Sequence, residues 1–202
     1  MEGRTLKPVI LLNAPPNAGK DEIAKILSRK LGLPHLEFKN KLFEIAKAIS
    51  GLTEEQWDSI YTREDKEKPT ELLFGLSPRQ FMIKVSEEVI KPNFGKDYFG
   101  RVAAEQAYGC GGVFSDSGFN QEAEEVVYKC GSDFVFVVQF ERIGCSFKGD
   151  SRDYLTSPHI KHYLKTTNNG TLEKITEEII NWVSSHYEED ILNTKYNLII
   201  KD

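Results

Sequence analysis

Short apolar runs alternate with amphipathic segments along this chain. The apolar runs are typical of strands in a parallel sheet, and they lie at residues 8–13, 112–115 and 134–140. Residues 36–38 and 163–166 are candidates for two further short strands. Apolar positions with helical spacing predict helices at residues 20–31, 41–49, 54–60, 78–90, 98–108, 121–128 and 172–182. Because strands alternate with helices, the pattern predicts an α/β fold with a parallel sheet of about five strands between two layers of helices.

Breaks in this pattern mark the loops. Residues 62–70 are charged and have no apolar period, which predicts a mobile loop. Ser77 and Pro78 are typical of a helix start, because serine caps free N–H groups and proline fits the first helical position. Residues 142–155 have the glycines and charges of a loop. The apolar residues of the tail, 191–202, are compatible with an added edge strand or with a dimer contact.

Size and charge narrow the classes of function. The chain has 202 residues, of which 40% are hydrophobic, and this predicts one domain. Its formal net charge is -5 with both signs interspersed, so we expect no broad basic face and no nucleic acid polymer as partner. The sequence shows neither an apolar run of roughly 20 residues nor a signal-peptide core, which predicts a cytoplasmic protein without a membrane partner. The three cysteines form no metal-binding pattern with the four histidines and fit reduced thiols.

The junction between the first strand and the first helix resembles a phosphate-binding loop. The usual pattern is G-x-x-x-x-G-K-[ST], and this chain has Ala14-Pro-Pro-Asn-Ala-Gly19-Lys20-Asp21. A helix N-terminus at this position offers free N–H groups to phosphate, and Lys20 could reach the outer phosphates. The alternative is an ordinary turn with a chance Gly-Lys pair. The candidate ATP- and phosphate-binding residues are Asn13, Ala14, Asn17, Ala18, Gly19, Lys20, Asp21 and Glu22.

Asp21 stands where the pattern has a hydroxyl residue that would bind Mg²⁺. A carboxylate there would repel phosphate unless the metal, or a water on the metal, lies between them. Asp21 is therefore a candidate Mg²⁺ ligand, directly or through water. The alternative is that it only caps the helix.

Two further candidates follow strands. Asp116 lies at the carboxyl end of a buried strand, where open α/β sheets bind ligands, and could orient a metal-bound water or accept a proton. The loop after the clearest strand, 134–140, carries Arg142 and Arg152, and arginine suits a transferring phosphoryl group. If the loop closes, it would bring both arginines to the site and exclude water. The alternative for Asp116 is an ordinary turn residue, and the alternative for the loop with Arg142 and Arg152 is a solvated charged loop.

Four further cations lie between residues 63 and 79. Arg63, Lys66 and Lys68 lie in the charged loop. Arg79 falls in the first turn of a predicted helix, where a cation opposes the helix dipole. That conflict suggests that Arg79 faces an anion, such as a phosphate group on an acceptor.

Taken in order, these segments resemble the deoxynucleoside monophosphate kinases of tailed bacteriophages, within the P-loop kinase superfamily. The matching segments are Gly19-Lys20-Asp21, Lys66-Glu67, Ser77-Pro78-Arg79-Gln80, Phe94-Gly95-Lys96-Asp97, Ser115-Asp116-x-x-Phe119-x-x-Glu122-Ala123-Glu124 and Gly149-Asp150-Ser151-Arg152. They cover most of the chain, from residue 8 to about 182. Such kinases often have Asp-x-Arg-Phe where this chain has Asp116-Ser-Gly118-Phe119.

The resemblance implies a three-layer P-loop kinase fold and Mg²⁺-dependent transfer of the ATP γ-phosphate to a (deoxy)nucleoside 5′-monophosphate. It implies one domain, 1–202, and a homodimer is a further expectation from the family. The parts of the domain are a core at 8–38 and 110–182, a helical acceptor-binding region at about 39–108, a lid at about 142–156 and a tail at 188–202. The implied catalytic residues are Lys20, Arg142, Arg152 and Asp116. The implied acceptor-binding residues are Lys41, Arg63, Lys66, Arg79, Asp116, Phe119, Glu122 and Ser151.

Two rival interpretations stay open. One is a P-loop kinase for another phosphorylated small molecule, since phosphomevalonate kinases of the animal type resemble the chain at Gly19-Lys20-Asp21. The other is a nucleotide-binding protein without transferase activity, against which the pair of lid arginines argues. The residues do not indicate which base is accepted, or whether the sugar is ribose or deoxyribose. If the protein is viral, its compartment is the host cytoplasm.

Overall fold

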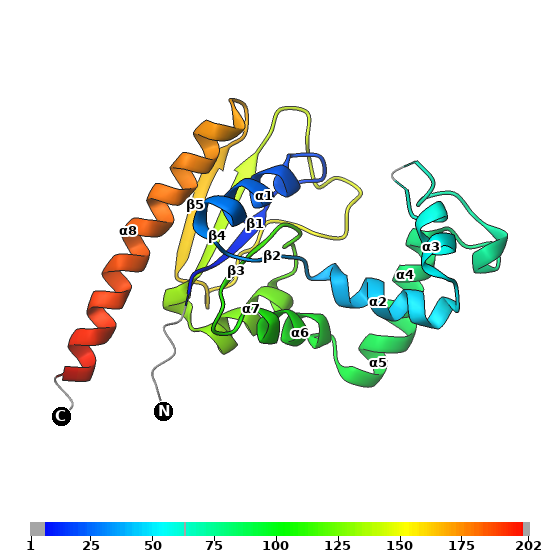
Figure 1. The fold of residues 1–202 in the computed structure, drawn as a ribbon, viewed down its shortest axis with the longest axis horizontal. Coiled ribbons are helices and arrows are strands. Elements are labelled where there is room, and N and C mark those ends of the chain that lie inside the picture. The colour runs from blue at the N-terminus through cyan, green and yellow to red at the C-terminus, as the bar shows by residue number, and fades with distance from the viewer. Residues whose placement is uncertain (1–6, 63, 200–202) are drawn as a thin grey trace. The chain divides into compact units, whose positions relative to one another are not determined.

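The computed structural model of this chain describes residues 7–62 and 64–199, with side chains up to residue 188. The chain divides into two compact units (Figure 1), and each is described by itself. The sheet unit comprises Met1–Phe38 and Gly100–Asp202, and the helical unit comprises Lys39–Phe99.

The sheet unit contains one five-stranded parallel sheet with the strand order β2-β3-β1-β4-β5. The strands are β1 (Val9–Asn13), β2 (His35–Leu36), β3 (Gly112–Phe114), β4 (Val135–Glu141) and β5 (His162–Thr167). The predicted α/β fold class and strand number are thereby confirmed. The second strand lies earlier than the predicted 36–38, because the Phe38 amide does not join the ladder and donates to the Asp116 carboxylate at 2.9 Å.

Helices cover both faces of this sheet (Figure 1). They are α1 (Lys20–Leu31), α6 (Tyr98–Ala107, whose first two residues belong to the helical unit), α7 (Asn120–Cys130) and α8 (Leu172–Ile199), with a short 3₁₀ turn at Ser132–Phe134. Ile10 and Leu12 of β1 pack in a core with α1 and α8, whereas Val9 and Leu11 pack in a core with α6 and α7. Alternate β1 residues thus enter opposite cores, which explains the continuous apolar run.

The helical unit contains α2 (Lys39–Ser50), α3 (Glu54–Ile60), a 3₁₀ turn (Glu71–Leu73), α4 (Pro78–Lys84), a π-helical segment (Val85–Ile90) and α5 (Lys91–Phe94). Ser77 caps α4 in a reciprocal capping box with Gln80, and Pro78 occupies the first turn, as predicted. The core of this unit is aromatic, with the fully buried Trp57 packed against Phe43 and Phe81.

Two helices are longer than predicted. The helix expected to end at Ile90 continues through the π-helical segment as α5 to Phe94, so Pro92 lies within the helical run and not beyond its end. The closing helix, predicted at residues 172–182, extends to Ile199. Ile175, Ile179 and Val183 recur every four residues and continue the buried stripe of α8 past residue 182.

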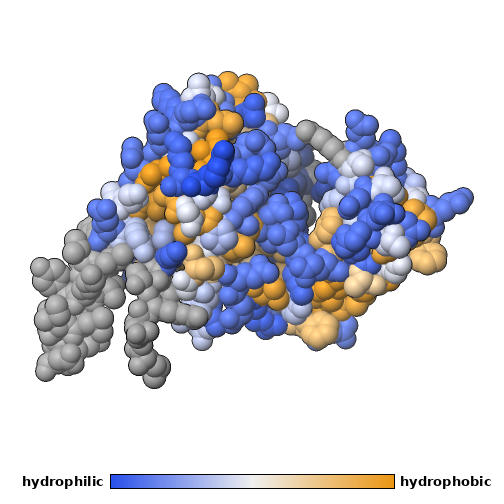
Figure 2. Space-filling view, in the orientation of Figure 1, coloured by the Kyte–Doolittle hydropathy of each residue, from blue (hydrophilic) through white to orange (hydrophobic). Residues whose placement is uncertain are grey.

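The tail predicted at 191–202 is therefore not an edge strand up to Ile199, because its backbone is helical there. Residues 200–202 lie outside the described part of the chain. The dimer contact stays a prediction. Among the helices in residues 7–62 and 64–199, none combines the length and the hydropathy of a membrane-spanning segment. Hydrophilic side chains cover most of the face shown in Figure 2, and apolar side chains form separate patches.

Candidate functional site

The loop between β1 and α1 has a backbone that suits anion binding. Gly19 has φ 96°, and Asn17 is in the left-handed region with φ 62°. Gly19 is the cap residue of α1 and has no side chain to bond the first N–H groups, while Asp21 lies exposed in the first turn. The first N–H groups of α1 are thus available to an anion at the loop, as in helix N-termini that bind phosphate.

Lys20 crosses this loop and lies in a cluster of charges. Its Nζ donates to the carbonyl oxygens of Ala14 and Pro15 at 2.5 and 2.8 Å, and the residue is only 8% exposed. Burial, followed by the positive charge of Arg152, lowers the pKa of Lys20 to about 8. Asp21, Asp150 and Asp116 act in the opposite direction on this pKa. The structure therefore places Lys20 within electrostatic reach of the lid and of the end of β3.

Arg152 is held within the lid. Its Nε and Nη2 donate to the two oxygens of Asp150 at 2.9 and 2.8 Å, and its backbone N–H donates to Asp150 Oδ1 at 2.9 Å. Hydrogen bonding to Asp150 raises the pKa of Arg152, and the charges of Asp116 and Asp21 act in the same direction. Lys20, Arg152, Asp116 and Asp21 thus form one charged site, which we call the charge cluster.

Asn13 ties the lid to the sheet. This fully buried side chain donates to the carbonyl oxygens of Ser117 and Asp153 at 3.1 and 3.0 Å. Its Oδ1 accepts from Gln139 Nε2 at 3.1 Å and from the Leu155 amide at 2.8 Å. These bonds use the full capacity of an amide side chain. The predicted contact of Asn13 with ATP stays a prediction, and the structure adds a framework role that the sequence did not indicate.

The other lid arginine has a different environment. Arg142 is exposed, and its Nη1 donates to the Asn17 carbonyl at 3.4 Å. Nearby, Asn168 is buried and donates from Nδ2 to the Ala18 carbonyl at 2.7 Å. A Cβ on Gly19 would lie 2.9 Å from Asn168 Nδ2, so this position needs glycine for space as well as for its φ.

Sequence reasoning missed Asn168 and Gln139 as site residues. Asn168 directly follows β5, and an asparagine at the end of a strand was a signal. Gln139 is a single amide in the apolar β4, and a buried polar group of that kind needs partners. Both bond groups far away in sequence, so their partners could not be named beforehand.

The predicted acceptor-binding residues divide between the two units. In the sheet unit, Phe119 precedes α7, Glu122 lies in its first turn, and Ser151 is exposed in the lid. In the helical unit, Arg79 lies 3.5 Å from a Glu67 oxygen, and its backbone N–H donates to the Lys66 carbonyl.

The remaining two acceptor residues differ in what the structure shows of them. Lys41 pairs with Glu44 at 2.8 Å. Arg63 lies outside the described residues.

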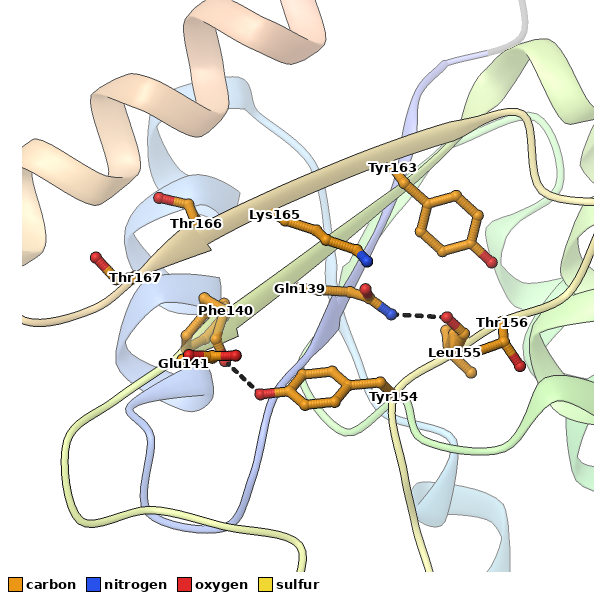
Figure 3. Close-up of a pocket in the computed structure, with 10 residues that line it drawn as sticks. All are labelled: Gln139, Phe140, Glu141, Tyr154, Leu155, Thr156, Tyr163, Lys165, Thr166 and Thr167. Atoms are coloured by element: carbon orange, nitrogen blue, oxygen red, sulfur yellow. Dashed lines mark hydrogen bonds between the residues drawn. The ribbon is translucent and has the colours of Figure 1, made fainter.

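A cavity of about 590 Å³ lies beside the lid (Figure 3). Gln139 of β4 and Lys165 of β5 face it from the sheet, and Tyr154 and Leu155 face it from the lid. Gln139 Nε2 donates to the Leu155 carbonyl at 2.7 Å, and the Tyr154 hydroxyl donates to the Phe140 carbonyl at 3.4 Å. None of the predicted site residues lines this cavity.

Cys110, Cys130 and Cys145 are free, and burial raises the pKa of Cys130 to about 11. Within the described ranges, no group of three or more His, Cys, Asp or Glu side chains is placed to hold a metal ion. A divalent ion here would therefore need ligands from a bound nucleotide besides those of the protein.

One comparison with known proteins, that with solved structures, bears on the fold. No protein-family model matches the chain, and a search of curated proteins finds no match. A solved gluconokinase from Sinorhizobium meliloti 1021 is similar with a TM-score of 0.52 and 11% identity, covering 93% of this chain and 98% of that one. A sugar kinase from Janibacter sp. HTCC2649 aligns with a TM-score of 0.43 and 13% identity, covering 88% and 95%. The first likeness, with the parallel five-stranded sheet, shows that the chain has the P-loop kinase fold.

Proposed function

We propose that this chain is a kinase that transfers the γ-phosphate of ATP to a small molecule, and that the acceptor is a (deoxy)nucleoside 5′-monophosphate. The observation that carries the proposal is the charge cluster: the lysine of a phosphate-loop-like turn shares its electrostatic environment with a lid arginine and two carboxylates. A site for binding alone would not need a second cation brought in by a separate loop.

The chemistry follows from the positions of these groups. Phosphoryl transfer asks the protein mainly to position its substrates and to stabilise negative charge. The amides at the start of α1 and Lys20 hold the outer phosphates of ATP. Arg152 offers its remaining N–H groups to the phosphoryl group in transfer, where bidentate contacts are strongest. Arg142, near the Asn17 carbonyl, supports the nucleotide from the outer side of the loop.

Asp21 and Asp116 are the residues that fit Mg²⁺. Both carboxylates act on the pKa of Lys20, the residue that we assign to the outer phosphates. Carboxylate oxygens are ligands that Mg²⁺ prefers, and the ion usually also binds the phosphates and water. When bound, the ion would neutralise negative charge on the phosphates. Asp116 also accepts a hydrogen bond from the Phe38 amide, which fixes its orientation toward β2.

The acceptor assignment rests on the segments Ser77-Pro78-Arg79-Gln80 and Asp150-Ser151-Arg152 and on their resemblance to phage nucleotide kinases. Arg79, at the start of α4 with an exposed side chain, is the residue we assign to the acceptor phosphate. A second candidate is a sugar-acid kinase, which the similarity to a gluconokinase favours. Phosphomevalonate stays a third acceptor for the same site.

A coupled ADP-release assay tests the proposal. The acceptors are the four deoxynucleoside monophosphates, the ribonucleoside monophosphates, gluconate and phosphomevalonate, each with ATP and Mg²⁺. We expect turnover with one or more deoxynucleoside monophosphates, and none with the Lys20→Ala variant. Turnover only with gluconate or phosphomevalonate would replace the acceptor assignment. If no acceptor supports turnover while ATP still binds, the chain is a nucleotide-binding protein and the kinase proposal fails.

A further inference from the structure

The aliphatic part of the Arg152 side chain packs against a glycine, Gly118. A Cβ on Gly118 would lie 2.5, 2.7 and 2.8 Å from Cβ, Cγ and Cδ of Arg152, so the stem of the arginine lies directly on the glycine backbone. Gly118 is not among the glycines with positive φ, so its backbone conformation would accept other residues. The arginine stem, and not the chain's conformation, is what requires glycine at position 118.

The head of Arg152 is held from the other end. Asp150 binds Nε and one terminal nitrogen of the guanidinium in a two-pronged contact, and the Asp150 side chain is only 8% exposed. A guanidinium has five N–H donors, so this contact leaves three of them for a ligand as far as the described residues go. The carboxylate therefore fixes the plane of the guanidinium without using up its donors.

The two segments that carry these residues are joined to each other. The Asp153 amide donates to the Gly118 carbonyl at 3.2 Å, and Asn13 bridges the carbonyl oxygens of Ser117 and Asp153. The Leu155 amide returns to Asn13 Oδ1 at 2.8 Å. Arg152 thus stands on a part of the lid that is already bonded to the ends of β1 and β3.

We propose that Asp150 and Gly118 are positioning residues that hold the Arg152 guanidinium in a fixed place and orientation. The backbone of Gly118 supports the aliphatic part of the Arg152 side chain, and the Asp150 carboxylate orients its guanidinium. The consequence for catalysis rests on the proposed kinase function: a preset cation does not have to be ordered when the phosphoryl group moves, and small losses of such order reduce kcat strongly.

Kinetics give the first test, with ATP and the best acceptor from the assay above. We expect Asp150→Asn to lower kcat by about 10- to 100-fold while the Kd for ATP changes by less than about threefold. Gly118→Ala should lower kcat in the same way, because its methyl group displaces the arginine stem. Asp133→Asn is the matched control, since it also removes one carboxylate of an ion pair in the sheet unit, with Lys161 at 2.9 Å. Wild-type kcat in Asp150→Asn would overturn the proposal.

A double variant separates positioning from general structural damage. If Asp150 acts through Arg152, adding Asp150→Asn to Arg152→Ala should lower kcat no further than Arg152→Ala alone. A further loss of the full single-variant size would show that Asp150 works by another route. Thermal unfolding of each variant shows whether the fold survives.

An NMR measurement tests whether Asp150 and Gly118 hold Arg152, and it needs no activity assay. In the wild type the assigned ¹⁵Nε–¹H group of Arg152 should show the high heteronuclear NOE of a rigid side chain. In Asp150→Asn and Gly118→Ala that NOE should fall. The same NOE in all three proteins would show that Asp150 and Gly118 do not hold the Arg152 side chain. If the wild type phosphorylates no acceptor, the proposed function fails, and the NMR result still decides whether Asp150 and Gly118 hold the arginine.

Discussion

The two units of the chain use their polar side chains in different ways. In the sheet unit, Asn13, Gln139 and Asn168 are buried and bond groups that are distant in sequence. In the helical unit the interior is an aromatic cluster around Trp57, and cations such as Lys41 and Arg79 form exposed ion pairs. Buried networks fix geometry, whereas exposed pairs contribute little to stability. We therefore expect substitutions in the sheet unit to change the chemical step and substitutions in the helical unit to change acceptor binding.

The largest expected effect is that of Lys20→Ala. Removing this buried amine takes away the cation that we assign to the outer phosphates of ATP, and kcat/KM should fall by about 10³-fold or more. The measurement is ADP release at saturating acceptor, with circular dichroism to show that the fold survives. Lys30→Ala, an exposed lysine in the last turn of α1, is the control and should retain activity. Equal activity in Lys20→Ala and the wild type would end the kinase assignment.

Within the sheet unit, the two lid arginines should differ. We expect Arg152→Ala to lower kcat by about 10²-fold with a smaller effect on ATP binding, because its charge belongs to the charge cluster. Arg142→Ala should lower kcat less and weaken ATP binding more, since this exposed side chain lies near the Asn17 carbonyl. Steady-state kinetics and calorimetric titration with ATP separate the two. The opposite ranking would exchange the roles of the two arginines.

The helical unit should respond in KM. Arg79→Ala is expected to raise the KM for the acceptor by about 20-fold, because a charge-assisted contact to phosphate is lost, with kcat and ATP binding close to wild type. Lys84→Ala is the matched variant on the same helix, since Lys84 is paired with Glu88 at 2.9 Å and exposed. An unchanged KM in Arg79→Ala, or an equal rise in Lys84→Ala, would remove Arg79 from the acceptor site.

The smallest expected effect is a pH dependence that comes from the sheet unit. The pKa of Lys20 is lowered to about 8 by burial and by Arg152, so the amine loses its charge as the pH rises through 8. We expect kcat/KM for ATP to fall roughly tenfold between pH 7 and pH 9. In Arg152→Ala the repelling cation is gone, so the fall should shift to higher pH. A profile with the same midpoint in both proteins would contradict this coupling.

The sequence predicted those features that depend on local pattern. The apolar runs predicted β1, β3 and β4 because both faces of these strands are buried. Ser77 with Pro78 predicted the start of α4 because caps act over three residues. The loop between β1 and α1 was predicted because its position depends on one strand and one helix. The helices predicted at 78–90 and 172–182 were given ends that are too early, since the helical backbone continues to Phe94 and to Ile199.

The parts that could not be predicted depend on pairing between distant segments. Nothing near Asn13 indicates that its partners lie at Ser117, Gln139, Asp153 and Leu155. In the same way, Gly118 reads as a loop glycine until the stem of Arg152 is placed on it. Such contacts are set by the order of strands in the sheet, which brings the ends of β1, β3 and β4 together.

The aromatic cluster of the helical unit has a practical consequence. The chain has two tryptophans, Trp57 in the helical unit and Trp182 on α8 in the sheet unit. Trp57 is enclosed by aromatic rings, and Trp182 packs edge-on against Phe136. Each unit therefore carries its own intrinsic fluorophore. With Trp182→Phe and Trp57→Phe, emission during denaturant titration follows one unit at a time, and coinciding midpoints would mean that both units unfold as a single cooperative transition.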